Sequence, residues 1–268
     1  MRLVKLKDAI EESEFGGKAA NLAKGIKAEL PVPDGFALNT VFVNKILEKN
    51  TLATNNLKSA FEDLNSMVAV RSSATGEDSK NASFAGQYLT MLNINSFEQL
   101  IEAIESVANS ALEISVLDYR EKLGLAQKPQ MAIVVQKLID VKTAGVLFTR
   151  NPITQAKEFL VEASWGIGEA VVAGLVIPDF FKLNIDGELV ESKIGIKDKA
   201  LNLNLNGGLD EVSIDKVQAV RSSLTNNDLK NLYQLANACK SVYGDDLDIE
   251  WGITNGKVHL LQCRSITT

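Results

Sequence analysis

The spacing of apolar residues along the chain predicts a mixture of helices and strands. Between residues 97 and 123, apolar side chains recur at intervals of three and four, which is the period of a helix with one buried face. Three apolar runs bounded by turn-forming residues then predict strands at 131–139, 145–149 and 159–163. The middle of the chain is therefore expected to be a helix followed by a sheet.

Glycine and proline mark the element boundaries in the N-terminal part. A strand and an acidic helix are expected first, followed by a Gly-Gly-Lys turn at residues 16–18 that opens another helix. Pro31 and Pro33 end that helix, because proline donates no backbone hydrogen bond and its ring clashes with the preceding turn. A short helical stretch at 41–66 and a strand at 68–71 are expected to follow.

Further turn signals divide the last third of the chain. Asp186-Gly187 predicts a hairpin within residues 180–194. Residues 202–208 are polar and rich in asparagine, which predicts a mobile loop, and a helix at 227–243 precedes a last pair of strands. Strands and helices do not follow a strict β-α-β order, so the pattern predicts an α+β protein.

The same pattern predicts two lobes with a cleft between them. We expect an N-terminal lobe at residues 1–135 and a C-terminal lobe at 136–268.

The composition narrows the possible ligands. The 268 residues carry a net charge of −6 with acidic and basic residues interspersed, so no basic face suited to nucleic acid is expected. A polyphosphate ligand is then expected to be held by a few local cations, backbone N–H groups and a metal. The single histidine, His259, excludes a metal site built on two histidines of this sequence.

The N-terminal residues and the cysteines indicate the compartment. The first dozen residues turn acidic without a long apolar run, so neither a signal peptide nor a membrane anchor is expected. Cys239 and Cys263 lie far apart in apolar surroundings, which is typical of reduced thiols. We therefore expect a cytoplasmic protein.

The last two strands place polar residues on one face. Asp248 and Glu250 alternate with apolar residues in the first strand, and Gln262 and Arg264 do so in the second. If the turn has three residues, 255–257, Glu250 lies opposite Gln262 and Asp248 lies opposite Arg264. A two-residue turn would shift the pairing by one residue and put Glu250 and Gln262 on opposite faces. We therefore predict the three-residue turn.

This register suggests a chemical role for the hairpin. The oxygens of Glu250 and Gln262 suit Mg²⁺, and Arg264 could stabilise charge on a transferring phosphoryl group. The alternative is an exposed hairpin face with a simple Asp–Arg ion pair. The same register places Leu261 in the core and makes His259 a structural residue on the core side.

Three other segments could contact an anion. The turn at 16–18 can aim N–H groups and Lys18 at a phosphate, although a surface lysine after such a turn is also ordinary. Arg71 precedes a loop of small and hydroxyl residues at 72–86, where it could fork across two phosphate oxygens or pair with an acid of that loop. A glycine-rich turn ending in Glu169 could be a further contact or a plain strand-to-helix turn.

Taken in order, these segments resemble the phosphoenolpyruvate synthase and pyruvate phosphate dikinase family, which includes rifampin phosphotransferase. The matching strings are GGKAANL, LPVPDGFAL, VAVRSSATGEDSKNASFAGQ, VVQKLI, AGVLFTRNPIT, EASWGIGEAVVAG, IPDFF, DIEWGI and LQCRSIT. The resemblance implies an ATP-grasp fold with ATP in the cleft between the lobes, and Mg²⁺ as the metal.

The resemblance also implies roles for matching residues. Lys18 and Arg71 would contact the phosphates and act in catalysis with Arg264, while Glu250 and Gln262 would bind Mg²⁺. A second set would surround the nucleotide, as a loop over the phosphates, as a hinge facing adenine and as the glycine-rich contact: Thr75, Ser83, Gly86, Gln87, Gln136, Leu138 and Glu169.

The family reaction splits ATP to AMP, passes the β-phosphate to a histidine on a swivelling domain, and releases the γ-phosphate to water or orthophosphate. No such domain is found in this sequence, so the resemblance implies a phosphohistidine carrier in trans or on a separate part of the protein. The segment 41–66 is shorter than usual and Ser265 stands where proline is common. Two alternatives stay open: a direct kinase that leaves ADP, and a nucleotide-sensing module without catalysis.

Overall fold

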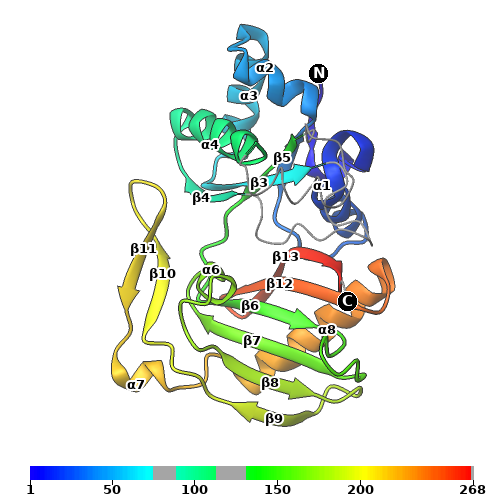
Figure 1. Cartoon of the computed structure of the whole chain (residues 1–268), viewed down its shortest axis with the longest axis vertical. Helices are drawn as coiled ribbons and strands as arrows, with labels where there is room; N and C mark the ends of the chain where they lie inside the picture. Colours follow the sequence, from blue (N-terminus) through cyan, green and yellow to red (C-terminus); the bar gives the residue numbers. More distant parts are fainter. Residues whose placement is uncertain (75–88, 113–130, 267–268) are drawn as a thin grey trace.

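The computed structural model describes residues 1–74, 89–112 and 131–266. The described residues form two large sheets, one above the other in Figure 1, and a separate two-stranded ribbon. Helices and antiparallel strands occur in both halves, which confirms the α+β prediction. No described helix is both long and apolar enough to cross a lipid bilayer.

The first lobe is a five-stranded sheet with strand order β1-β2-β5-β3-β4. Buried residues of α2, α3 and α4, among them Phe42, Leu57 and Ile104, pack with strand residues in its main core. The helical stretch expected at 41–66 consists of two helices, because Asn39 and Asn50 each cap a new helix. The elements are β1 (Leu3–Lys5), η1 (Leu6–Asp8), α1 (Glu12–Lys27), β2 (Gly35–Leu38), α2 (Thr40–Leu47), α3 (Thr51–Leu64), β3 (Val68–Ala74), β4 (Thr90–Ile94), α4 (Phe97–Ser110) and β5 (Met131–Lys137).

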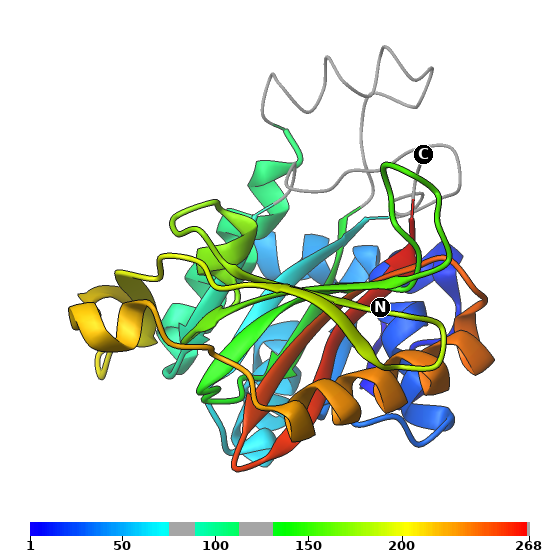
Figure 2. The same cartoon turned by 90° about the horizontal axis from the view of Figure 1, so that it is seen from below.

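The second lobe is a six-stranded sheet with strand order β13-β12-β6-β7-β8-β9. Helix α8 covers one face of it, as Figure 2 shows, and buries Leu232, Ala236 and Cys239 against Ile249 and Trp251. The opposite face carries the polar positions of the last two strands. The elements are β6 (Thr143–Phe148), β7 (Phe159–Trp165), α6 (Glu169–Val172), β8 (Asp179–Leu183), β9 (Leu189–Lys193), α7 (Lys216–Ala219), α8 (Asn226–Tyr243), β12 (Leu247–Thr254) and β13 (Lys257–Ser265).

The ribbon consists of β10 (Lys199–Leu203) and β11 (Leu209–Ser213). The asparagine-rich segment 202–208, expected to be a mobile loop, is instead the end of β10 and the turn of this hairpin. Its polar groups hydrogen-bond to the first lobe, which residue composition alone did not indicate. The helix expected at 97–123 is seen as α4, and residues 113–130 lie outside the described part of the chain.

The turn of the last hairpin differs from the prediction. Thr254 pairs with Lys257, so the turn has two residues, and the expected three-residue turn is wrong. A bulge at Leu261 adds one residue to β13 and shifts the register by one beyond it. The bulge therefore restores the pairing of Glu250 with Gln262 that a two-residue turn alone would have broken.

The bulge also reverses the burial expected near the turn. Leu260 is buried in the core of the second lobe, and Leu261, for which the core position was expected, is only half-buried. His259 is half-buried as well and does not belong to the buried core. Its expected place on the core side is wrong for the same reason, because the alternation of faces changes at the bulge.

Candidate functional site

The Gly-Gly-Lys turn is fixed to the end of β3. Gly16 has φ 78° and ψ 165° and interrupts the helical conformation of α1, so a new helix opens at this turn as expected. The side chain of Ser73 donates to the carbonyl oxygen of Phe15 at 2.6 Å and accepts from the amide of Ala19 at 3.0 Å. Lys18 is buried and its Nζ donates to Ser72 Oγ at 3.4 Å, so its ammonium group lies beside β3.

Arg71 joins the two lobes. It lies on β3 opposite Thr90 and Val134, and its side chain is 11% exposed. Its Nη1 lies 3.5 Å from Glu250 Oε2 and 3.5 Å from Gln262 Oε1, both on the second lobe. Its Nε is buried without an acceptor among the described residues. These contacts to the last hairpin were not among the alternatives expected for Arg71, and the acidic residues of the loop after β3 lie outside the described residues.

The polar face of the last hairpin has the register expected from the sequence. Glu250 lies opposite Gln262, and Asp248 lies opposite Arg264, on β12 and β13. Arg264 donates to Asp248 Oδ2 from Nε at 2.8 Å and from Nη2 at 2.6 Å. The carboxylate of Glu250, the amide oxygen of Gln262 and the guanidinium of Arg264 therefore lie on one face of the hairpin. Arg71 contacts the first two.

Glu169 is electrostatically linked to this group. It is the first residue of α6 and is exposed overall, while its carboxyl group is partly buried. Burial raises the pKa of Glu169, the negative charge of Glu250 raises it further, and Arg71 opposes both. The structure thus brings Glu169 near two of the other expected site residues.

Glu162 is a carboxylate that the sequence analysis missed. Strand pairing places it in one row with Val146 and Glu250 on the same face of the sheet. It is half-buried, and burial raises its pKa. A polar residue at an alternating position of an apolar strand is the signal that could have found it.

The hinge residues lie where the chain passes from the first lobe to the second. Gln136 is buried on β5, and its Nε2 donates to the carbonyl oxygen of Pro33 at 3.3 Å. Leu138 is half-buried, and its amide donates to the carbonyl oxygen of Met67 at 2.8 Å. Four expected contacts lie outside the described residues: Thr75, Ser83, Gly86 and Gln87.

The donor atoms of Glu250 and Gln262 fit a hard divalent cation. Both are oxygens, and both lie at the same distance from the cationic Nη1 of Arg71, so the pair already faces a positive group. Among the described residues, no group of three or more His, Cys, Asp or Glu could hold a metal by itself. An ion here would take two protein ligands and complete its shell with water or phosphate oxygens, as Mg²⁺ commonly does.

Comparison with known proteins identifies similar sequences over the whole chain. The family model described as "Pyruvate phosphate dikinase, AMP/ATP-binding domain" matches residues 52–268. An uncharacterized phosphotransferase of Bacillus subtilis, YvkC, is 36% identical over 100% of this chain and 35% of its own length. A probable phosphoenolpyruvate synthase of Archaeoglobus fulgidus is 30% identical over 94% of this chain and 40% of its own.

A rifampicin phosphotransferase of Bacillus subtilis is 29% identical over 96% of this chain and 34% of its own length. The chain thus spans between 34% and 40% of the length of these curated relatives. Among solved structures, D-alanine–D-alanine ligase from Helicobacter pylori aligns with 95% of this chain and 54% of its own, at 13% identity and a TM-score of 0.43.

Proposed function

Because this chain belongs to the pyruvate phosphate dikinase AMP/ATP-binding domain family, we propose that it binds Mg-ATP in an ATP-grasp arrangement, between its two lobes, and transfers a phosphoryl group from it. The observation that carries the proposal is the contact of Arg71, from the first lobe, with Glu250 and Gln262 of the second. A positively charged side chain that could bind phosphate thus lies beside two side-chain oxygens that could bind Mg²⁺, at the contact between the two lobes. We propose the cytoplasm as the place of this reaction.

Each side chain has a distinct role in this proposal. Lys18 and Arg71 supply positive charge to the phosphates from the first lobe, where β3 and the 16–18 turn hold them together. Glu250 and Gln262 hold Mg²⁺, which when bound neutralises phosphate charge and orients the oxygens. Arg264, oriented by Asp248, stabilises the charge on the transferred group.

The hinge and the strand-to-helix turn complete the nucleotide site. We propose that Gln136 and Leu138 line the adenine end and that Glu169 contacts the nucleotide from the start of α6, together with the expected residues Thr75, Ser83, Gly86 and Gln87.

The acceptor is proposed to be a histidine outside these 268 residues. The only histidine of the sequence, His259, is half-buried near the β12–β13 turn, and burial and Lys257 lower its pKa. In the dikinase reaction, ATP is split to AMP, the β-phosphate forms a bond to a histidine nitrogen of the carrier, and the γ-phosphate leaves to water or orthophosphate. The relatives include both a probable phosphoenolpyruvate synthase and a rifampicin phosphotransferase, so the family as a whole does not define one final phosphate acceptor.

Incubation with Mg²⁺ and β-labelled ATP, with and without an extract of the source cells, tests the proposal. We expect AMP and acid-labile label on a protein histidine. ADP without labelled protein would instead indicate a direct kinase with a small-molecule acceptor. Absence of Mg-ATP binding in calorimetry would refute the proposal.

A further inference from the structure

The ribbon of β10 and β11 connects the two lobes at one edge. In Figure 1 it stands beside the second sheet, and its tip reaches β4 and α4 of the first lobe. Asn93 Nδ2 donates to the carbonyl oxygens of Asn204 at 2.6 Å and Gly208 at 2.8 Å, and the amide of Gly208 donates back to Asn93 at 3.1 Å. Two further bonds join Asn95 to Leu205 and Gln99 to Asn206.

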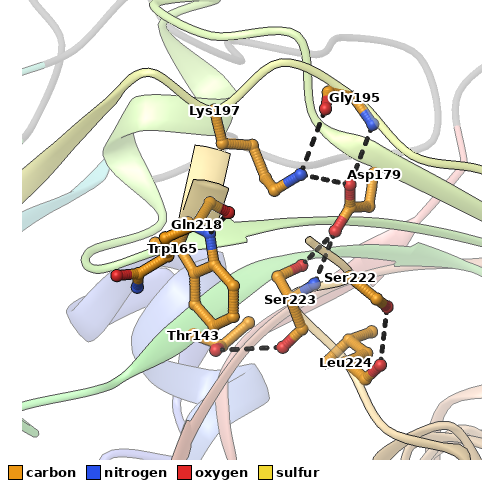
Figure 3. Close-up of polar contacts among 9 residues, drawn as sticks. All are labelled: Thr143, Trp165, Asp179, Gly195, Lys197, Gln218, Ser222, Ser223 and Leu224. Atoms are coloured by element: carbon orange, nitrogen blue, oxygen red, sulfur yellow. Dashed lines mark hydrogen bonds and ion pairs between the residues drawn. The ribbon is translucent and has the colours of Figure 1, made fainter. Parts of the chain in front are cut away.

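The base of the ribbon is fixed to the second lobe by a buried charge network, drawn in Figure 3. Lys197, just before β10, donates to Asp179 of β8, and both side chains are 0% exposed. Asp179 Oδ2 accepts from the amide and the hydroxyl of Ser223, both at 2.7 Å, and Ser223 follows α7. One carboxylate oxygen of Asp179 therefore binds Lys197 before the ribbon and the other binds Ser223 after it, so both ends of the segment that carries the ribbon are held to the sheet.

Apolar packing continues the connection towards the hinge. Leu92 of β4 packs against a small core of Val141, Ala144 and Ile167. The same core is covered by three residues of the ribbon: Leu201, Leu203 and Leu209. The contact between ribbon and first lobe is therefore both polar and apolar.

Asn93 links this contact to the proposed phosphate site. It is 0% exposed and has φ 60°, a left-handed conformation that asparagine tolerates better than most residues. It lies on β4, whose Thr90 is the strand partner of Arg71. A displacement of β4 would therefore move Arg71 relative to Glu250 and Gln262.

The other edge of the interlobe contact is made by α1. The hydroxyl of Tyr243 on α8 donates to the carbonyl oxygen of Asn21 at 2.7 Å, and the side-chain Nδ2 of Asn21 donates to the carbonyl oxygen of Cys263 at 3.4 Å. Loss of the tip contact would leave the first lobe free to pivot about α1.

We propose that Asn93 is a positioning residue, which binds the ribbon tip and so holds the first lobe at the orientation in which Arg71 reaches Glu250 and Gln262. This inference rests on the proposed function only where it predicts a change in Mg-ATP binding. The lobe orientation itself can be measured without ATP.

The test compares Asn93→Gly with Asn65→Gly. Asn65 is also a left-handed asparagine, with φ 42°, but it ends α3 on the surface and makes none of the described hydrogen bonds to the ribbon, so it controls for the backbone effect. Fluorescent labels at Asp63→Cys and Asp186→Cys, one exposed site on each lobe, report the interlobe distance by energy transfer. The native cysteines are buried and will not compete for label.

We expect Asn93→Gly to lengthen or broaden the interlobe distance and to weaken Mg-ATP binding about three- to tenfold, as expected when two ordinary hydrogen bonds are lost. Gln99→Ala, a surface change that should not impair folding, should shift the distance in the same direction by less. Wild-type distances in both variants would overturn the proposal. If the wild type does not bind Mg-ATP, the proposed function fails, while the distances still decide the role of Asn93.

Discussion

Asp248 and Arg264 face each other directly on β12 and β13, and one oxygen of Asp248 binds the guanidinium at both Nε, 2.8 Å, and Nη2, 2.6 Å. Two charge-assisted bonds to one oxygen fix the plane of the guanidinium. The end of the side chain is then oriented before any phosphate arrives. This relationship makes Asp248 a residue that acts through Arg264.

We expect Asp248→Asn to slow AMP formation about tenfold or more while ATP affinity changes little, because a mispositioned arginine loses charge stabilisation in the transition state first. Arg264→Ala should slow the reaction by about 10²-fold or more and still bind ATP. Single-turnover rates and calorimetry measure the two effects. Asp246→Asn, which breaks the exposed ion pair with Arg150, is the control and should leave the rate unchanged. A wild-type rate in Asp248→Asn would rule out this role.

Glu250 should govern the magnesium dependence. We expect Glu250→Gln to raise the Mg²⁺ concentration needed for half-maximal ATP binding at least about tenfold, since even an outer-sphere partner of a metal costs that much. The measurement is ATP binding titrated with Mg²⁺. Glu211→Gln, on an exposed ion pair of the ribbon, is the control. An unchanged magnesium midpoint would contradict the assignment of Glu250 as a ligand.

Gly16 should tolerate no side chain. A Cβ there would lie 1.9 Å from the carbonyl oxygen of Ser73, and φ is +78°. Gly174 has a similar φ of +66° with nothing within 4 Å, so Gly174→Ala carries only the backbone cost. We expect Gly16→Ala to lower the free energy of unfolding by about 2 kcal/mol more than Gly174→Ala does. Urea denaturation checks this, and equal losses would mean that the turn at 16–18 adapts.

The sequence predicted the α+β class because its signals were local. Periodicity and turn residues identified most strands and helices, and parity placed Glu250 beside Gln262 and Asp248 beside Arg264. The predicted length of that turn was wrong, but the predicted pairing of Glu250 with Gln262 was correct. A bulge at Leu261 compensates for the shorter turn. A bulge arises from packing with other strands, so alternation within one strand cannot reveal it.

The ribbon could not be predicted for a related reason. Residues 202–208 look like an unstructured polar loop until the first lobe provides partners for their carbonyl groups. Arg71 contacts residues 179 and 191 positions away, and only the family resemblance, not spacing, grouped it with them.

The titration of Glu162 and Glu169 should make stability depend on pH in a defined direction. Burial is the main cause that raises the pKa of both carboxyls above the ordinary 4.5. Just above pH 4.5 the folded state therefore binds more protons than the unfolded state, so the free energy of unfolding falls as pH rises through this window. Urea denaturation across the window should show this slope, and Glu162→Gln and Glu169→Gln should each flatten it. Persistence of the full slope in both variants would contradict the assignment.

Glu191 should make stability depend on pH in the opposite direction, because its pKa is lowered. A hydrogen bond from Lys193, followed by one from Lys182, lowers the pKa of Glu191 below 4.5. Its contribution is complete above pH 4.5 and is lost as pH falls through the lower folded value. Glu191→Gln should therefore lower the free energy of unfolding by a constant amount above pH 4.5, and urea denaturation should show that it removes part of the pH slope only below pH 4.5.

The stability of the fold should depend on the buried ion pair between Lys197 and Asp179. Lys197→Met removes the only cation described beside Asp179 and leaves a buried carboxylate, so we expect the free energy of unfolding to fall by about 3 kcal/mol or more. Lys199→Met, two residues further along, breaks an exposed pair with Glu211 and should cost less than about 1 kcal/mol. Because Lys197 fixes the base of the ribbon, hydrogen exchange at residues 199–213 should rise in Lys197→Met and not in Lys199→Met. Equal effects of the two substitutions would show that the buried network does not anchor the ribbon.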